Sequence, residues 1–129
     1  MLILNENQIA HLARQDARAR YEFSVKKIVD WEAAWALYDR GWVMAKDAAG
    51  QHALQLWPAQ ALATSYIEPQ SAHFDVREVR LDDLVESLLP TLAADGITVA
   101  LYALPEPGNV AVVTAADLLA DLTAEASRY

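Results

Sequence analysis

The sequence predicts an α/β (α+β) fold, in which a mixed, largely antiparallel sheet of about six strands packs with three to five helices. Three observations predict it. Stretches with helical periodicity alternate with short runs of branched and aromatic residues, turn residues separate these runs, and 129 residues are enough for one ordinary core. The sequence lacks the regular strand-helix-strand repeat of a doubly wound parallel sheet. We therefore expect a single globular domain over residues 1–129.

The N-terminal region of about residues 6–30 is predicted to be helical. Asn5 and Gln8 have the spacing of a capping box, and apolar residues recur after them at near-helical intervals. One long helix fits this pattern, and so do two helices with a break near Asp16. The α/β body is expected to follow over about residues 33–126.

The stretch 34–46 is predicted to form a β-hairpin. Its halves "WALYD" and "WVMAK" are rich in aromatic and branched residues, and Arg40-Gly41 between them allows the positive φ of a tight turn. A second turn at "DAAG" leads into "HALQLW", so we expect a three-stranded antiparallel meander. Pro58 then suits the first position of a short helix.

The second half of the chain is predicted to contain three more strands and two more helices. "FDVREV" is expected to be a strand, followed by a helix that Asp83 and Glu86 cap, that Pro90 kinks or divides and that Gly96 ends. "ITVALYAL" is almost wholly apolar, which predicts a central strand covered on both faces. "VAVV" is the last predicted strand, and Thr114 is the predicted N-cap of the last helix.

The charge of the chain disfavours several classes of partner. The formal net charge is −8 and the pI is about 4.7, so we expect no binding to nucleic acid or to an anionic membrane. Residues 47–129 hold three Lys/Arg and twelve Asp/Glu, so the acidity belongs to the last two thirds of the chain. Five of the seven Lys/Arg of residues 1–46 fall in one helical stretch, as is typical of a solvated helix face: Arg14, Arg18, Arg20, Lys26 and Lys27.

The cysteine count and the apolar runs bear on the compartment. Cysteine is absent, which excludes disulfides and suits a reducing compartment. The N-terminus lacks the pattern of a secretory signal, and no apolar run is long enough for a membrane span. We therefore expect a cytoplasmic protein.

Few residues are arranged as catalysis or metal binding would require. His11, His52 and His73 are isolated from one another, so no metal site is predicted. No G-x-S-x-G motif or glycine-rich phosphate loop occurs, and no cofactor is predicted. Asp82 and Asp83, with His73, leave one alternative: a small enzyme that uses acid-base chemistry in a pocket at the strand ends. Carboxylates at a helix start are more simply explained as caps.

The aromatic residues favour a different hypothesis. Trp35 and Trp42 flank the predicted turn and are expected to form a cross-strand pair. With Tyr38 and Trp57 they are the candidate interaction residues, mainly in the core but with one edge exposed to a partner. The leading hypothesis is a noncatalytic protein-interaction module. The expected partner is a basic protein, as in toxin neutralisation, a second copy that forms a two-fold dimer through a strand edge or the hairpin, or both.

Four motifs also occur in an order and spacing that point to a known family. They are "WALYDRGW", "LWP", "LDDL" and "LPTLAADGI". Over about residues 20–122 the chain resembles an uncharacterised bacterial family catalogued as domain of unknown function 2750. The family supplies no catalytic residues to transfer. The resemblance therefore implies a compact bacterial α/β domain and little more.

Overall fold

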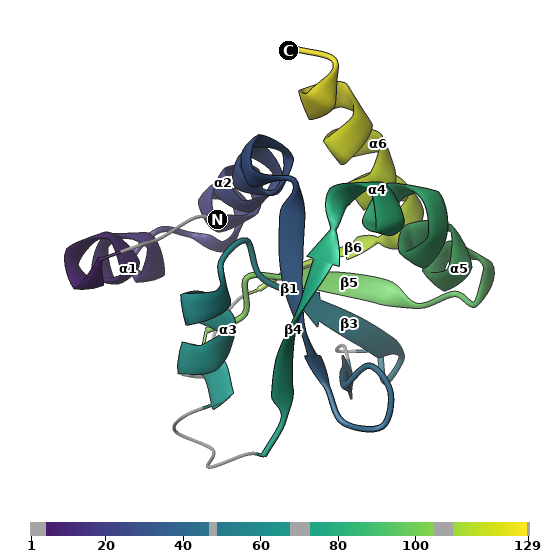
Figure 1. Ribbon diagram of the computed structural model, residues 1–129, viewed down its shortest axis with the longest axis horizontal. Coiled ribbons are helices and arrows are strands. Elements are labelled where there is room, and N and C mark those ends of the chain that lie inside the picture. Colours follow the sequence, from purple (N-terminus) through teal and green to yellow (C-terminus); the bar gives the residue numbers. More distant parts are fainter. Residues whose placement is uncertain (1–4, 47–48, 68–72, 105–109, 129) are drawn as a thin grey trace.

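The computed structural model describes residues 5–46, 49–67, 73–104 and 110–128. Within these ranges six strands form two sheets (Figure 1). β1 (Ala33–Tyr38) and β4 (Asp75–Arg80) form an antiparallel pair. The other sheet has the order β2-β3-β5-β6, from β2 (Met44–Lys46), β3 (His52–Leu56), β5 (Thr98–Leu101) and β6 (Ala111–Thr114). Only β3 and β5 are parallel, which confirms the mixed, largely antiparallel arrangement.

The N-terminal region forms two helices, α1 (Glu6–Ala13) and α2 (Ala17–Trp31). The Asn5 side chain accepts a hydrogen bond from the Gln8 backbone N–H at 2.8 Å, and the Gln8 side chain accepts one from the Asn5 N–H at 3.0 Å. This is the predicted capping box. The Asp16 side chain accepts from the Ala19 N–H at 2.7 Å and so begins a new helix. Of the two alternatives for this region, the structure shows two helices with a break near Asp16.

The predicted three-stranded meander is wrong in its first strand. β2 pairs with β3 as expected, but β1 pairs with β4 along its whole length. The expected turn exists, with φ of 60° at Arg40 and 143° at Gly41, yet between the strands that it joins only one isolated bridge forms, Tyr38 to Trp42. The end of β3 occupies part of the same edge of β1, through hydrogen bonds of 2.8 and 2.9 Å between the backbones of Trp35 and Trp57. The opposite edge of β1 is left to β4.

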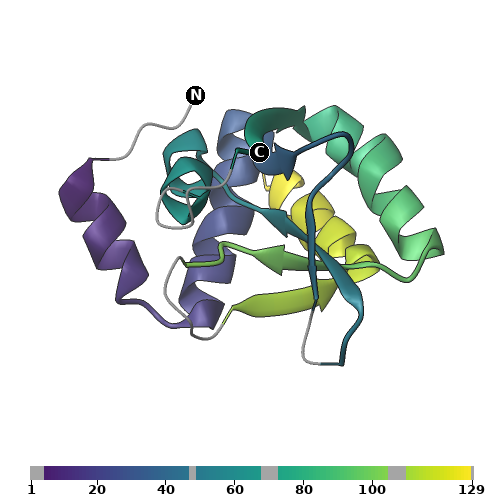
Figure 2. The ribbon, with the colours of Figure 1, turned by 90° about the horizontal axis from the view of Figure 1, so that it is seen from below.

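Two apolar clusters lie on opposite faces of β1. Ala34 and Ala36 face a cluster that is covered by α2, α5 (Leu89–Ala94) and α6 (Ala115–Ala126). Trp35 and Leu37 face a cluster that includes α3 (Gln60–Ile67). The small side chains of β1 belong to the cluster on which α2, α5 and α6 pack, and its large side chains belong to the other cluster. Figure 2 shows the three helices in the ribbon. β5 lies between β3 and β6 with Val99 and Leu101 fully buried, which confirms the predicted central strand.

The helix after β4 has three parts: α4 (Leu81–Asp83), a π turn (Leu84–Leu88) and α5 (Leu89–Ala94). The π turn comes just before Pro90. In a regular α-helix the ring of this proline would clash with a carbonyl of the preceding turn. Pro90 thus divides the helix, as predicted, and Gly96 ends it with a φ of 70°. The predicted capping box of Asp83 and Glu86 is wrong, because β4 runs directly into the helix and Arg80 is the N-cap.

The ends of the two remaining helices test two further predictions. The Thr114 hydroxyl accepts a hydrogen bond from the Asp117 N–H at 3.0 Å, which confirms Thr114 as the N-cap of α6 (Ala115–Ala126). Helix α3 starts at Gln60 rather than at Pro58, because the residues before Gln60 form a bend.

α6 is joined to α2 by a hydrogen bond that the Tyr21 hydroxyl donates to Asp121. Burial and this bond raise the pKa of Tyr21.

Tyr102, directly after β5, gives a prediction for alkaline pH. Its side chain is 1% exposed and its backbone φ is 65°. Burial raises its pKa from 10.0 to about 12, so above pH 10 the unfolded chain ionises while the folded chain stays neutral. The free energy of unfolding should therefore fall as the pH rises from 10 to about 12. Denaturant titrations at a series of pH values measure this. Tyr102→Phe should reduce the slope, leaving the contribution of Tyr21, and an unchanged slope would contradict the assignment.

Candidate interaction groove

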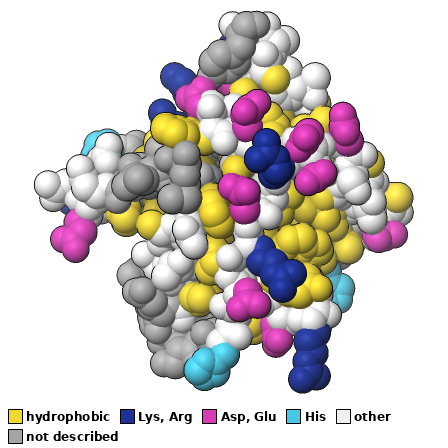
Figure 3. All heavy atoms as spheres, in the orientation of Figure 1, with side chains coloured by type: hydrophobic (Ala, Val, Ile, Leu, Met, Phe, Trp, Pro, Cys, Tyr) yellow, Lys and Arg dark blue, Asp and Glu magenta, His cyan; other side chains and the backbone are white. Residues whose placement is uncertain are grey.

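A groove of about 530 Å³ lies between the start of β2, strand β4 and the helix formed by α4, the π turn and α5. Side chains from all three elements line it: Trp42, Met44, Glu78, Val79, Asp83, Ser87, Leu88, Thr91, Leu92, Asp95 and Ile97. Figure 3 shows apolar side chains gathered on this face. They lie between helix α5 on one side and the charged side chains of β4 on the other. The groove therefore combines an apolar floor with a polar margin.

The floor of the groove continues the main apolar cluster. Val79 and Leu92 are buried in that cluster, and Trp42, Met44 and Ile97 pack against it while remaining partly exposed. Because these side chains already touch buried neighbours, they form a firm surface rather than a loose one.

The margin along the helix depends on the π turn. Asp83, Ser87, Thr91 and Asp95 recur every four residues, and on a regular α-helix such a series drifts by about 40° per step. The extra residue of the π turn offsets about 100° of that drift. The four side chains therefore stay on one side of the helix and line a single groove.

Three carboxylates give the groove its charge. Glu78 comes from β4, Asp83 from the first turn of α4 and Asp95 from the end of α5. All three are exposed, and among the described residues none of them forms an ion pair. No Lys or Arg is among the described residues that line the groove. It therefore presents a negative potential over an apolar floor.

The Trp42 ring is held in place from one side. It meets the ring of Tyr38 edge-on, with centroids 5.3 Å apart and an interplanar angle of 87°. The Arg77 guanidinium lies over the Tyr38 ring, 3.6 Å from the ring centre, and also forms an ion pair with the Asp75 carboxylate at 3.8 Å. Tyr38 thus supports Trp42, and the charge of Arg77 is taken up by the ring and the carboxylate.

The other predicted aromatic residues lie in the core. Trp57 is fully buried, and its indole N–H donates a hydrogen bond to the Ala103 carbonyl at 2.9 Å. Trp35 is 9% exposed and faces the same cluster. The predicted ring pair of Trp35 with Trp42 is wrong, since Trp42 pairs with Tyr38. Of the four candidate interaction residues, Trp35 and Trp57 are withdrawn from the surface and only Trp42 lines the groove.

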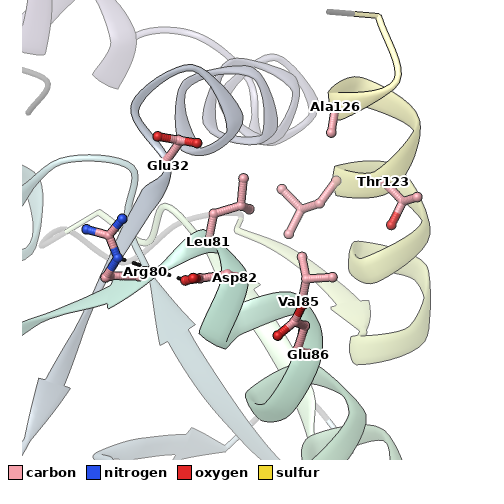
Figure 4. A pocket seen from close by; sticks show the side chains of 9 residues that line it. Glu32, Arg80, Leu81, Asp82, Val85, Glu86, Thr123 and Ala126 are labelled. Atoms are coloured by element: carbon pink, nitrogen blue, oxygen red, sulfur yellow. Dashed lines mark ion pairs between the residues drawn. The ribbon is translucent and has the colours of Figure 1, made fainter.

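The structure separates the three acid-base candidates. Asp83 lines the groove, whereas Asp82 lines a different pocket of about 320 Å³ between the end of α2, α4 and α6. In that pocket Asp82 is 3.9 Å from the Arg80 guanidinium, with Glu32 and Glu86 also on its wall (Figure 4). His73 is exposed before the far end of β4, a strand about 17 Å long. The geometry does not bring these residues together as a catalytic site.

The cations predicted to form one solvated helix face differ in their surroundings. Arg20 is 4% exposed and donates a hydrogen bond to the Gln15 carbonyl, while Arg18 pairs with Glu22 and Lys27 with Asp30.

In the described part of the chain, no three His, Asp or Glu side chains gather as a metal site would need. No helix in the described ranges is both long enough and apolar enough to cross a membrane.

The fold and the groove together define a small α/β protein with an acidic, apolar surface groove. The chain belongs to the family described as "Protein of unknown function (DUF2750)", whose sequence profile matches residues 21–122. This range includes every residue that lines the groove, and α1 lies before it. A search of curated proteins found no match. The family resemblance of the sequence is confirmed, and it leaves the function to be inferred from the groove.

Proposed function

We propose that this protein is a noncatalytic interaction module whose groove binds a basic segment of another protein. The observation that carries the proposal is the groove itself, with Trp42 on its wall and Glu78, Asp83 and Asp95 on its margin. Partly exposed tryptophan beside an apolar floor is the type of residue that dominates binding energy in protein interfaces. Carboxylates around such a floor select a partner by charge.

The expected partner segment carries one bulky apolar side chain flanked by Lys or Arg. The apolar side chain would pack between Trp42, Met44 and Leu88, and the cations would face the carboxylates. The overall charge of −8 would speed the encounter with a basic protein and disfavour nucleic acid. Neutralisation of a basic toxin is one biological form that such binding would take.

Affinity capture with the full chain tests this proposal against two matched variants. The groove variant combines Glu78→Gln, Asp83→Asn and Asp95→Asn. The control combines Glu32→Gln, Asp82→Asn and Glu86→Gln, which removes the same charge from the other pocket. We expect a partner of basic pI that the native chain and the control retain and that the groove variant loses, with affinity falling about tenfold or more.

The proposal also predicts that salt weakens the complex, since the pairing charges are exposed. An acidic or neutral partner would contradict it, as would a partner that both variants bind equally well. The proposal would also be contradicted if the native chain captured no protein that the groove variant fails to capture.

A further inference from the structure

We infer that β6 is a self-association edge, at which a second copy of this chain pairs antiparallel to extend the four-stranded sheet. β6 is the last strand in the order β2-β3-β5-β6, so its only partner in the sheet is β5. In the described part of the chain its outer side is open (Figure 2). Alternate residues of an antiparallel edge strand point their N–H and C=O groups outward, ready for another strand.

The absence of charged residues distinguishes β6 from the edge strands β2 and β4. From Val110 to Ala116 no residue is charged, whereas charged side chains commonly protect sheet edges. The β2 edge ends in Lys46, and β4 carries Arg77, Glu78 and two further charges. β1 is not a free edge along its whole length, because it lies between β4 and the end of β3. β6 is thus the edge with the weakest barrier to pairing.

The Val112 side chain supports a second copy as the occupant. It is 41% exposed, and Trp31 is the other large apolar side chain that is similarly exposed in the described ranges. Antiparallel pairing about a two-fold axis at Val112 sets this residue opposite itself and Ala111 opposite Val113. Valine pairs of this kind stabilise a sheet. Two copies that each carry a charge of −8 also repel least along an uncharged strand.

The dimer leaves the interaction groove free. The groove is lined by the β2 side of the sheet, and β6 is at the opposite end. A strand of four residues buries little area, so we expect association that dissociates on dilution. This inference stands apart from the proposed function, because a monomer could bind a basic partner equally well through the groove.

Sedimentation equilibrium of the full chain over a roughly hundredfold range of concentration tests the inference. The native chain should rise from 14.2 kDa toward twice that mass. Val112→Lys should remain at the monomer mass, because it places two like charges opposite each other. Val112→Thr, an uncharged and β-branched control, should still associate. Circular dichroism establishes that both variants are folded.

Hydrogen exchange on the native chain gives an independent measurement. Alternate β6 amides should exchange rapidly in dilute solution and slowly in concentrated solution. A monomer mass for the native chain at the highest concentration would overturn the inference. So would a Val112→Lys variant that associates as the native chain does, because the contact would then lie elsewhere.

Discussion

Trp57→Ala is expected to lower the free energy of unfolding by about 3–5 kcal/mol, the range for deletion of a buried large aromatic side chain. The ring is fully buried in the cluster that includes Leu37, Leu62 and Tyr102. It also lies 5.1 Å from the Tyr66 ring, measured between centroids. Removing it leaves a cavity beside both sheets and removes the hydrogen bond to Ala103. Denaturant titration of the native chain and the variant measures the loss.

Trp57→Phe separates the ring from the hydrogen bond. Phenylalanine keeps part of the aromatic volume but cannot donate to the Ala103 carbonyl, so we expect an intermediate loss of about 1–3 kcal/mol. Trp31→Ala is the matched exposed control, since Trp31 is 45% exposed, and should cost about 0.5 kcal/mol or less. A similarly small loss for Trp57→Ala would contradict the position of Trp57 in the core.

Trp42→Ala is expected to weaken binding of the captured basic partner by about 30-fold or more, the effect of losing an interface hot spot. The Trp42 ring lines the groove together with Met44 and Ile97. Tyr38 supports the ring from outside, so the free protein already holds the ring in one place. Titration calorimetry with the purified partner measures the change in affinity.

Trp31→Ala serves again as the control, because it removes an exposed tryptophan that does not line the groove. It should leave the affinity within about twofold of the native value. Equal losses in the two variants would mean that the partner does not distinguish the groove from the rest of the surface.

Local signals in the sequence predicted much of the fold. Asn5, Asp16 and Thr114 cap helices through bonds to residues three positions away, so the determinants of each start lie together in the sequence. The partner of β1 was not predictable in this way. Alternation within a strand says which residues share a face, but not which distant strand supplies the hydrogen bonds, and β4 begins 37 residues after β1 ends.

The candidate site was only partly predictable. Trp42 begins one short apolar run and Trp57 ends another. Only the three-dimensional packing shows that Trp42 lines the groove and that Trp57 fills the core. Asp83 was considered beside Asp82 as an acid-base pair, whereas the helix turns them toward different pockets. The four-residue spacing of Asp83, Ser87, Thr91 and Asp95 was a signal of the groove's margin. Its meaning depends on a π turn, which periodicity alone does not reveal.

Nuclear magnetic resonance mapping of the bound surface tests the central claim most directly. The chain, labelled with nitrogen-15, would be titrated with the captured basic partner. The account predicts that the largest shifts occur at the Trp42 indole N–H and at the backbone amides of Glu78, Asp83 and Leu88, which line the groove. Shifts centred instead on Glu32, Asp82 and Thr123, around the other pocket, would contradict it while leaving the fold unchanged.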